Sequence, residues 1–76
     1  METGQKRFGE KVRELRREKK LSQEELAFRA GIHRNYLGGI ERGERNPCLN
    51  NILSIAVALD VSPAELFSRF KKSHKK

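Results

Sequence analysis

Apolar residues recur every three or four positions along most of the chain, which is the spacing of one face of an α-helix. In the first segment, Phe8, Val12 and Leu15 follow this spacing and predict a helix from about Gln5 to Lys20. No segment shows the sustained alternation of apolar and polar residues that is typical of a strand. We therefore expect an all-α chain.

A second, shorter helix has a clear start signal. Ser22 and Glu25 have the spacing of a capping box, in which each side chain accepts a hydrogen bond from the other residue's backbone N–H. They predict a helix from Gln23 to about Arg29. Gly31 is placed to adopt the positive φ of a tight turn after it.

Three more helices complete the chain. One is expected from about His33 to Arg42, with Gly43 as its stop. Pro47 indicates a connecting loop over residues 44–48, because it biases the residue before it away from helix. The next helix begins at Leu49 or Asn50 and ends at Leu59. Its expected buried stripe is Ile52, Ile55, Ala56 and Leu59.

Ser62, Pro63 and Glu65 indicate the start of the last helix. They are an N-cap residue, a proline at the first helical position and an acidic residue at the third. This helix is expected to carry Leu66, Phe67 and Phe70. The pattern as a whole predicts a compact bundle of five short helices. We expect residues 1–76 to form a single domain, with an ordered core over about 7–70 and a basic tail over 71–76.

A chain of 76 residues buries only about 60% of its unfolded surface, so a partner subunit is an expected source of stability. Cys48 is the only cysteine, which excludes a disulfide within the chain and suits a reducing compartment. Cys48, His33 and His74 are too few and too scattered for a zinc site, and we expect neither a metal nor another cofactor.

The charge balance points to the class of partner. Seventeen Lys and Arg against ten Asp and Glu give a formal net charge of +7, which favours a polyanion such as nucleic acid or an anionic membrane. The polar stretch from Met1 to Lys6 lacks the apolar run of a signal peptide, and no stretch reaches the roughly 18 apolar residues of a membrane span. We expect a soluble, cytoplasmic protein.

Residues 23–42 combine two short helices with a glycine turn in the arrangement of a helix-turn-helix. Ala27 is small where the two helices must approach, and Gly31 makes the turn. The apolar wedge beneath both helices is expected to be Leu26, Ile32, Leu37 and Ile40. The opposite face of the second of these helices would be offered to the major groove of DNA, and it holds Arg34, Asn35, Gly38, Gly39 and Arg42.

Here the chain resembles a known family. Five positions match the helix-turn-helix pattern of the phage repressor and Cro (XRE) superfamily: Gln23, Ala27, Gly31, Leu37 and Ile40. A narrower likeness, over residues 33–37 and 40–46, is to the controller proteins of restriction–modification systems. The resemblance covers about residues 7–70 and implies a transcription regulator without enzymatic activity. It implies a homodimer that binds a palindromic operator in double-stranded DNA.

The resemblance also implies roles for individual residues. Arg34, Asn35 and Gln23 match base-reading positions, since Arg recognises guanine and Asn recognises adenine bidentately. Contacts with the DNA backbone are expected from Arg42, Arg45, Asn46, Tyr36, His33 and Arg16. Arg16 and Glu41 match a structural ion pair between the first and third helices. The chain departs from the family at Gly39, where repressors often carry a base-reading side chain.

Several of these residues have a second interpretation. Tyr36 is equally well explained by partial burial in the core, and Asn35 and His33 also suit the start of a helix. Glu24 matches an acidic position where phage activators contact RNA polymerase, but it also suits the positive end of a helix dipole. The lysines of the tail are explained either as a solvated segment or as a general attraction for phosphate.

The expected dimer interface lies on the last two helices and comprises Leu49, Asn50, Ile52, Val61, Leu66, Phe67 and Phe70. The main alternative functions are an antitoxin that represses its own gene and a phage Cro-like repressor. A membrane-active helix is disfavoured because the apolar stripes are short and separate. The sequence contains no catalytic set and no aromatic platform for RNA, and it indicates no small-molecule effector.

Overall fold

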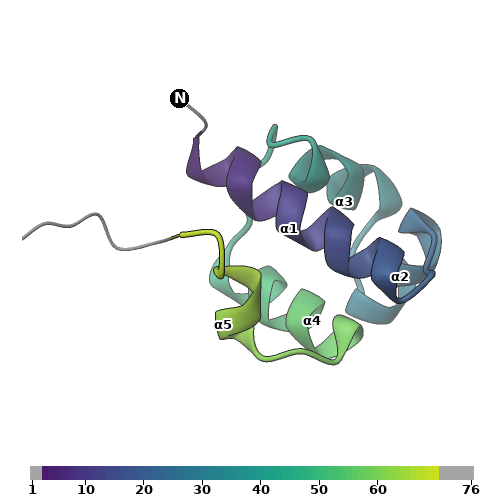
Figure 1. Ribbon diagram of the computed structural model, residues 1–76. Coiled ribbons are helices and arrows are strands. Elements are labelled where there is room, and N and C mark those ends of the chain that lie inside the picture. The colour runs from purple at the N-terminus through teal and green to yellow at the C-terminus, as the bar shows by residue number, and fades with distance from the viewer. Residues whose placement is uncertain (1–2, 71–76) are drawn as a thin grey trace, which may run out of the picture.

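Five helices build the fold of residues 3–70, which are the residues described by the structure, a computed structural model (Figure 1). They are α1 (Gly4–Glu18), α2 (Gln23–Ala30), α3 (Arg34–Glu41), α4 (Leu49–Leu59) and α5 (Pro63–Leu66). The expected bundle of five short helices is confirmed. α1 packs against α3 and α5, while α2 packs against α3 and α4. Within residues 3–70, no helix is long and apolar enough to cross a membrane.

The start and end of α2 follow the local signals. The Ser22 hydroxyl accepts from the backbone N–H of Glu25 at 3.0 Å, and the Glu25 carboxylate accepts from the N–H of Ser22 at 2.8 Å. This capping box holds the pKa of Glu25 below its usual range, because the backbone N–H of Ser22 stabilises the ionised form. Gly31 ends the helix with φ of 71°.

Two other helices are slightly shorter than the periodicity predicts. α1 ends at Glu18 and not at Lys20, because Lys20 takes a left-handed backbone with φ of 59°. α3 begins after His33, whose Nδ1 accepts from the N–H of Asn35 at 3.2 Å and thereby caps the helix. Gly43, with φ of 80°, turns the chain away after α3.

The last helix differs most from expectation, since α5 ends at Leu66 and includes neither Phe67 nor Phe70. After Leu66 the chain continues in tight turns, with the N–H of Phe70 donating to the carbonyl of Phe67 at 2.9 Å. These turns place the Phe67 ring 5.4 Å from the Phe8 ring and 5.6 Å from the Phe70 ring. The aromatic cluster therefore closes the bundle over the beginning of α1, and packing overrides helical continuation.

The core is one apolar cluster contributed by all five helices. It consists of Phe8, Val12, Leu15, Leu26, Ala27, Ala30, Leu37, Ile40, Ile55, Ala56, Leu59 and Leu66. Ile32 and Ile52, which were expected inside, are half-buried and pack against it. Gly9 allows the closest helix approach, because a Cβ there would lie 2.1 Å from the carbonyl oxygen of Ile40. α1 is thus pressed directly onto the end of α3.

Candidate nucleic-acid interface

The first turn of α3 carries two exposed polar side chains, Arg34 and Asn35. The apolar side of the same helix, formed by Leu37 and Ile40, has no exposed surface. Burial of that side fixes the rotation of α3, so that its first turn projects outward. The structure therefore gives Arg34 and Asn35 the exposure that base contacts in a major groove require.

A buried carboxylate ties together the helices that frame this surface. Glu41 is 5% exposed, and it accepts two hydrogen bonds from Arg16, at 2.7 and 3.0 Å. The expected Arg16–Glu41 ion pair is present. Glu41 also accepts from the side-chain amide of Gln23 at 3.0 Å, and a further N–H of Arg16 donates to the carbonyl of Leu21 at 2.9 Å. One carboxylate thus joins α1, α2 and α3.

This network constrains two of the expected DNA contacts. Arg16 directs three of its N–H groups inward, and its side chain is only 11% exposed. Gln23 is half-buried and uses one amide N–H on Glu41. Because a carboxylate only accepts, the amide oxygen of Gln23 and its second N–H stay available for another partner.

The two glycines of α3 are covered by long polar side chains. A Cβ on Gly38 would lie 3.1 Å from Nη1 of Arg42, and a Cβ on Gly39 would lie 2.7 Å from Cγ of Arg45. Gly38 and Gly39 are consequently buried, although the helical pattern places them on the outward face of α3. Because these two glycines have no side chains, the side chains of Arg42 and Arg45 can lie directly against the backbone of α3.

The side chain of Arg45 lies over Gly39 and extends toward Tyr36. Its guanidinium carbon lies 5.9 Å from the centre of the Tyr36 ring, within the range of a cation–π contact. Tyr36 is half-buried and packs on the core, so the ring has an inner and an outer face. The expected core contact of Tyr36 is present, and its contact with phosphate stays a prediction.

Arg42 lies on the same surface and is paired within the protein. Its Nε lies 3.1 Å from a carboxylate oxygen of Glu44, and both side chains are more than half exposed. The hydrogen bond between them raises the pKa of Arg42 and lowers the pKa of Glu44. Arg45 and Asn46 are also exposed in the loop that follows α3. A basic rim therefore borders α3, the helix expected to enter the major groove as the recognition helix.

The residues expected at the dimer interface separate into four groups. Leu49 and Asn50 are exposed at the start of α4, whereas Val61 is half-buried against the core. Ile52, Phe67 and Phe70 line a groove of about 390 Å³ beside the start of α1. Leu66 has no exposed surface. Its assignment to the interface is wrong, because a core side chain cannot reach a partner.

Two exposed apolar residues of α4 were missed. Leu53 is 40% exposed and Val57 is 80% exposed, and with Leu49 they follow each other at four-residue intervals. α4 contains no charged residue, in a chain of which 36% is charged. That absence of charge can be read from the sequence, and depletion of charged residues is typical of the centre of a contact surface.

α2 presents a different surface. Phe28 is 86% exposed, one turn after the exposed Glu24. Neither the aromatic ring nor its acidic neighbour contributes to the core. Among residues 3–70, no three His, Cys, Asp or Glu side chains gather as metal ligands would, and His74 lies outside the described residues.

Comparisons with known proteins identify the family of this chain. A helix-turn-helix family model matches residues 12–66. Over 60 residues the chain is 52% identical to control protein C.BamHI of Bacillus amyloliquefaciens, covering 78% of this chain and 74% of that protein. It is 43% identical over 67 residues to control protein C.MunI of a Mycoplasma species, covering 87% and 90%.

Solved structures agree. The restriction–modification controller protein C.AhdI from Aeromonas hydrophila superposes with a TM-score of 0.82 at 57% identity, covering 83% of this chain and 96% of that one. The family model's match over residues 12–66 contains Arg16 and Glu41 and the whole of α3 and α4. The chain belongs to the helix-turn-helix family of DNA-binding transcription regulators and is closely related to the controller proteins of restriction–modification systems.

Proposed function

We propose that this regulator binds a palindromic operator as a homodimer and controls transcription as the restriction–modification controller proteins that it resembles do. The observation that carries this proposal is the exposed Arg34–Asn35 pair on a helix whose rotation is fixed by burial. The supporting surface is rigid, because Glu41 bonds to α1 and α2 at once.

Affinity and sequence preference come from different residues in this proposal. Arg34 and Asn35 read base edges, and each bidentate contact discriminates by about 1–3 kcal/mol. Arg42, Arg45 and Asn46 bind phosphate oxygens at the rim, with Tyr36, His33 and the partly shielded Arg16 as further contacts. Gln23 offers its free amide oxygen or N–H to a base edge. Phosphate binding of this kind weakens as the salt concentration rises.

The dimer forms through the outer face of α4. Two copies of a chain with a net charge of +7 repel each other, so a stable contact needs a surface without charge. The face formed by Leu49, Leu53 and Val57 meets that need, and a two-fold axis can place it against itself. The two recognition helices would then enter successive major-groove turns about 34 Å apart.

Selection of bound sequences from a randomised duplex pool at moderate salt tests operator binding. We expect a palindrome with half-sites about one helical turn apart. Arg34→Ala should relax one base position in each half-site. Arg69→Ala removes the same charge from a residue that pairs with Glu14, and it should leave the selected sequence unchanged. Sequence-independent recovery with the parent protein would contradict the base-reading assignments.

Sedimentation equilibrium tests the dimer. Val57→Asp places two carboxylates against each other across the α4 face and should shift the protein to monomer. Ala64→Asp introduces the same charge at an exposed position of α5 and should leave the dimer intact. An unchanged dimer in Val57→Asp would place the contact elsewhere, with the Phe67–Phe70 groove as the next surface to substitute.

The exposed Phe28 favours a second contact, with RNA polymerase, through the surface that it shares with Glu24. An aromatic ring next to an acid, on an otherwise basic protein, suits a basic and apolar partner. Phe28→Ser should retain operator affinity and lose activated transcription in a purified system. Equal transcription with both proteins would contradict a contact between Phe28 and RNA polymerase.

A further inference from the structure

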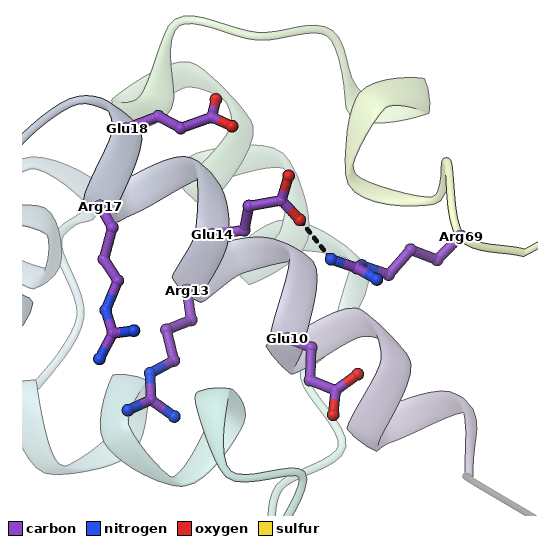
Figure 2. A pocket seen from close by; sticks show the side chains of 6 residues that line it. All are labelled: Glu10, Arg13, Glu14, Arg17, Glu18 and Arg69. Carbon is purple, nitrogen blue, oxygen red and sulfur yellow. Dashed lines mark hydrogen bonds and ion pairs between the residues drawn. The ribbon is translucent and has the colours of Figure 1, made fainter.

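A charged groove runs along the outer surface of α1. Its volume is about 670 Å³, and it is lined by Glu10, Arg13, Glu14, Arg17, Glu18 and Arg69 (Figure 2). The three glutamates follow each other at four-residue intervals, and so do Arg13 and Arg17. Residues at this spacing lie on one side of a helix. α1 therefore carries an acidic row and a separate basic row.

One glutamate of the acidic row, Glu14, forms ion pairs within the protein. Glu14 pairs with Arg69, which follows α5, and it lies 3.6 Å from the ammonium group of Lys11. Both contacts hold the pKa of Glu14 below its usual range, the hydrogen bond from Arg69 most strongly. In Figure 2, Glu14 and Glu18 extend from one side of α1, and Arg13 and Arg17 extend from the other.

The basic row has no comparable partners. Within residues 3–70, neither Arg13 nor Arg17 lies within ion-pair distance of a carboxylate, and both are exposed. Like charges four residues apart destabilise a helix, so the pair works against folding. The helix dipole accounts for Arg17, which lies in the last turn of α1, but not for Arg13. An external anion would account for both.

The basic row lies on the side of α1 next to the recognition helix. Gly9 and Arg16 mark the contact with α3, since Gly9 meets the backbone of Ile40 and Arg16 bonds to Glu41. Arg13 follows Gly9 by four residues, which places it about 40° further round α1, and Arg17 is a further step of about 40°. The row thus borders the α1–α3 junction on its solvent side.

We propose that Arg13 and Arg17 bind backbone phosphates of the operator DNA beside the recognition helix, as an extension of the basic rim of α3. This proposal rests on the proposed function. Glu14 and Glu18 extend from the other side of α1, and Glu14 is paired with Arg69, so a polyanion can approach Arg13 and Arg17 from one side (Figure 2). The contact carries no base information, so it contributes to affinity and to salt dependence without changing the operator sequence.

The test measures DNA affinity against salt concentration for the parent, Arg13→Ala/Arg17→Ala and Arg69→Ala. Two duplexes are used, the operator selected from the random pool and a scrambled sequence. We expect the double variant to reduce the slope of log affinity against log salt by about 1.8, which corresponds to two lost phosphate contacts at about 0.9 each. The affinities for the two duplexes should fall by the same factor. Arg69→Ala, a single change in the same groove, should leave the slope unchanged.

An unchanged slope, or a loss per removed charge equal to that of Arg69→Ala, would overturn the proposal and reduce the row to an effect of net charge. A parent protein that binds both duplexes equally would refute operator recognition, and the slope would still test the arginine row.

Discussion

Two regions of this protein use the same residue types for opposite purposes. The α1–α3 junction contains a glycine, Gly9, and an arginine–glutamate pair, Arg16–Glu41. The outward surface of α3 and the segment that follows it also contain a glycine, Gly39, and such a pair, Arg42–Glu44. In the junction the pair is buried and makes two hydrogen bonds, whereas on the surface both partners are more than half exposed.

The glycines differ in the same way. A Cβ on Gly9 would meet the backbone of α3, which cannot move without separating two helices. A Cβ on Gly39 would meet the side chain of Arg45, which lies on the surface and can rotate away. Burial therefore decides the role of each glycine and of each ion pair. The junction holds the helices in place, and the surface keeps its groups exchangeable with a ligand.

The largest effect is expected from breaking the buried pair. Glu41→Ala leaves the Arg16 charge without its partner and also removes the anchor of Gln23. The free energy of unfolding should fall by about 3–5 kcal/mol. Glu44→Ala is the matched change in the exposed pair and should cost less than about 1 kcal/mol. Urea denaturation at one fixed protein concentration measures both, and equal losses would refute the distinction between the two regions.

The second-largest loss of stability is expected from a substitution of Gly9 in the α1–α3 junction. Gly9→Ala forces α1 away from the carbonyl of Ile40, and overpacking of this kind costs about 1–3 kcal/mol or more. Gly4→Ala adds the same methyl group at the start of the helix, where the nearest ring atom is an ordinary 3.5 Å away. Gly4→Ala should change the melting temperature little. A stable Gly9→Ala protein would mean that α1 tolerates displacement.

Gly39→Ala should affect DNA binding more than folding. Alanine gains about 1 kcal/mol of helix propensity over glycine, and this gain offsets the displacement of Arg45. We expect a free energy of unfolding within about 1 kcal/mol of the parent. Operator binding should weaken, because the new methyl group displaces the side chain of Arg45 from the surface of α3. Paired melting and DNA titrations separate the two effects. Unchanged affinity would show that DNA binding does not depend on where Arg45 lies.

The smallest effect is expected from releasing Arg42. Glu44 holds Arg42 by a 3.1 Å ion pair and competes with phosphate for it. Because the pKa of Glu44 is lowered, the carboxylate stays ionised at neutral pH, and Glu44→Gln removes a charge that is present. Operator affinity should rise by up to about fivefold, since an exposed pair contributes less than about 1 kcal/mol. Reduced affinity would assign Glu44 a positive role in binding.

Much of the helix-turn-helix could be predicted because its signals are local. The capping box of Ser22 and Glu25 and the turn at Gly31 involve residues at most four apart. The Arg16–Glu41 pair joins residues 25 apart and was found only through the resemblance to repressors. Spacing alone carries no information about contacts across that distance.

Residues at contact surfaces were predicted less well. Leu66 was placed in the interface and lies in the core, while Leu53 and Val57 were overlooked although they are exposed. All three are apolar residues at helical spacing, and the pattern does not distinguish the side of a helix that packs inward from a second apolar side. Only the positions of the neighbouring helices resolve this ambiguity.

Local patterns predicted the five helices, the start of α2 and the turn at Gly31, because capping and periodicity act over a few residues. The candidates for DNA contact came from the outward face of the helix-turn-helix and from the resemblance to repressors. The tertiary structure alone decided that α5 ends before Phe67 and that Gly9 presses on Ile40. It also decided that Arg45 lies over Gly39. These outcomes depend on side chains from distant segments competing for the same space, which no local pattern records.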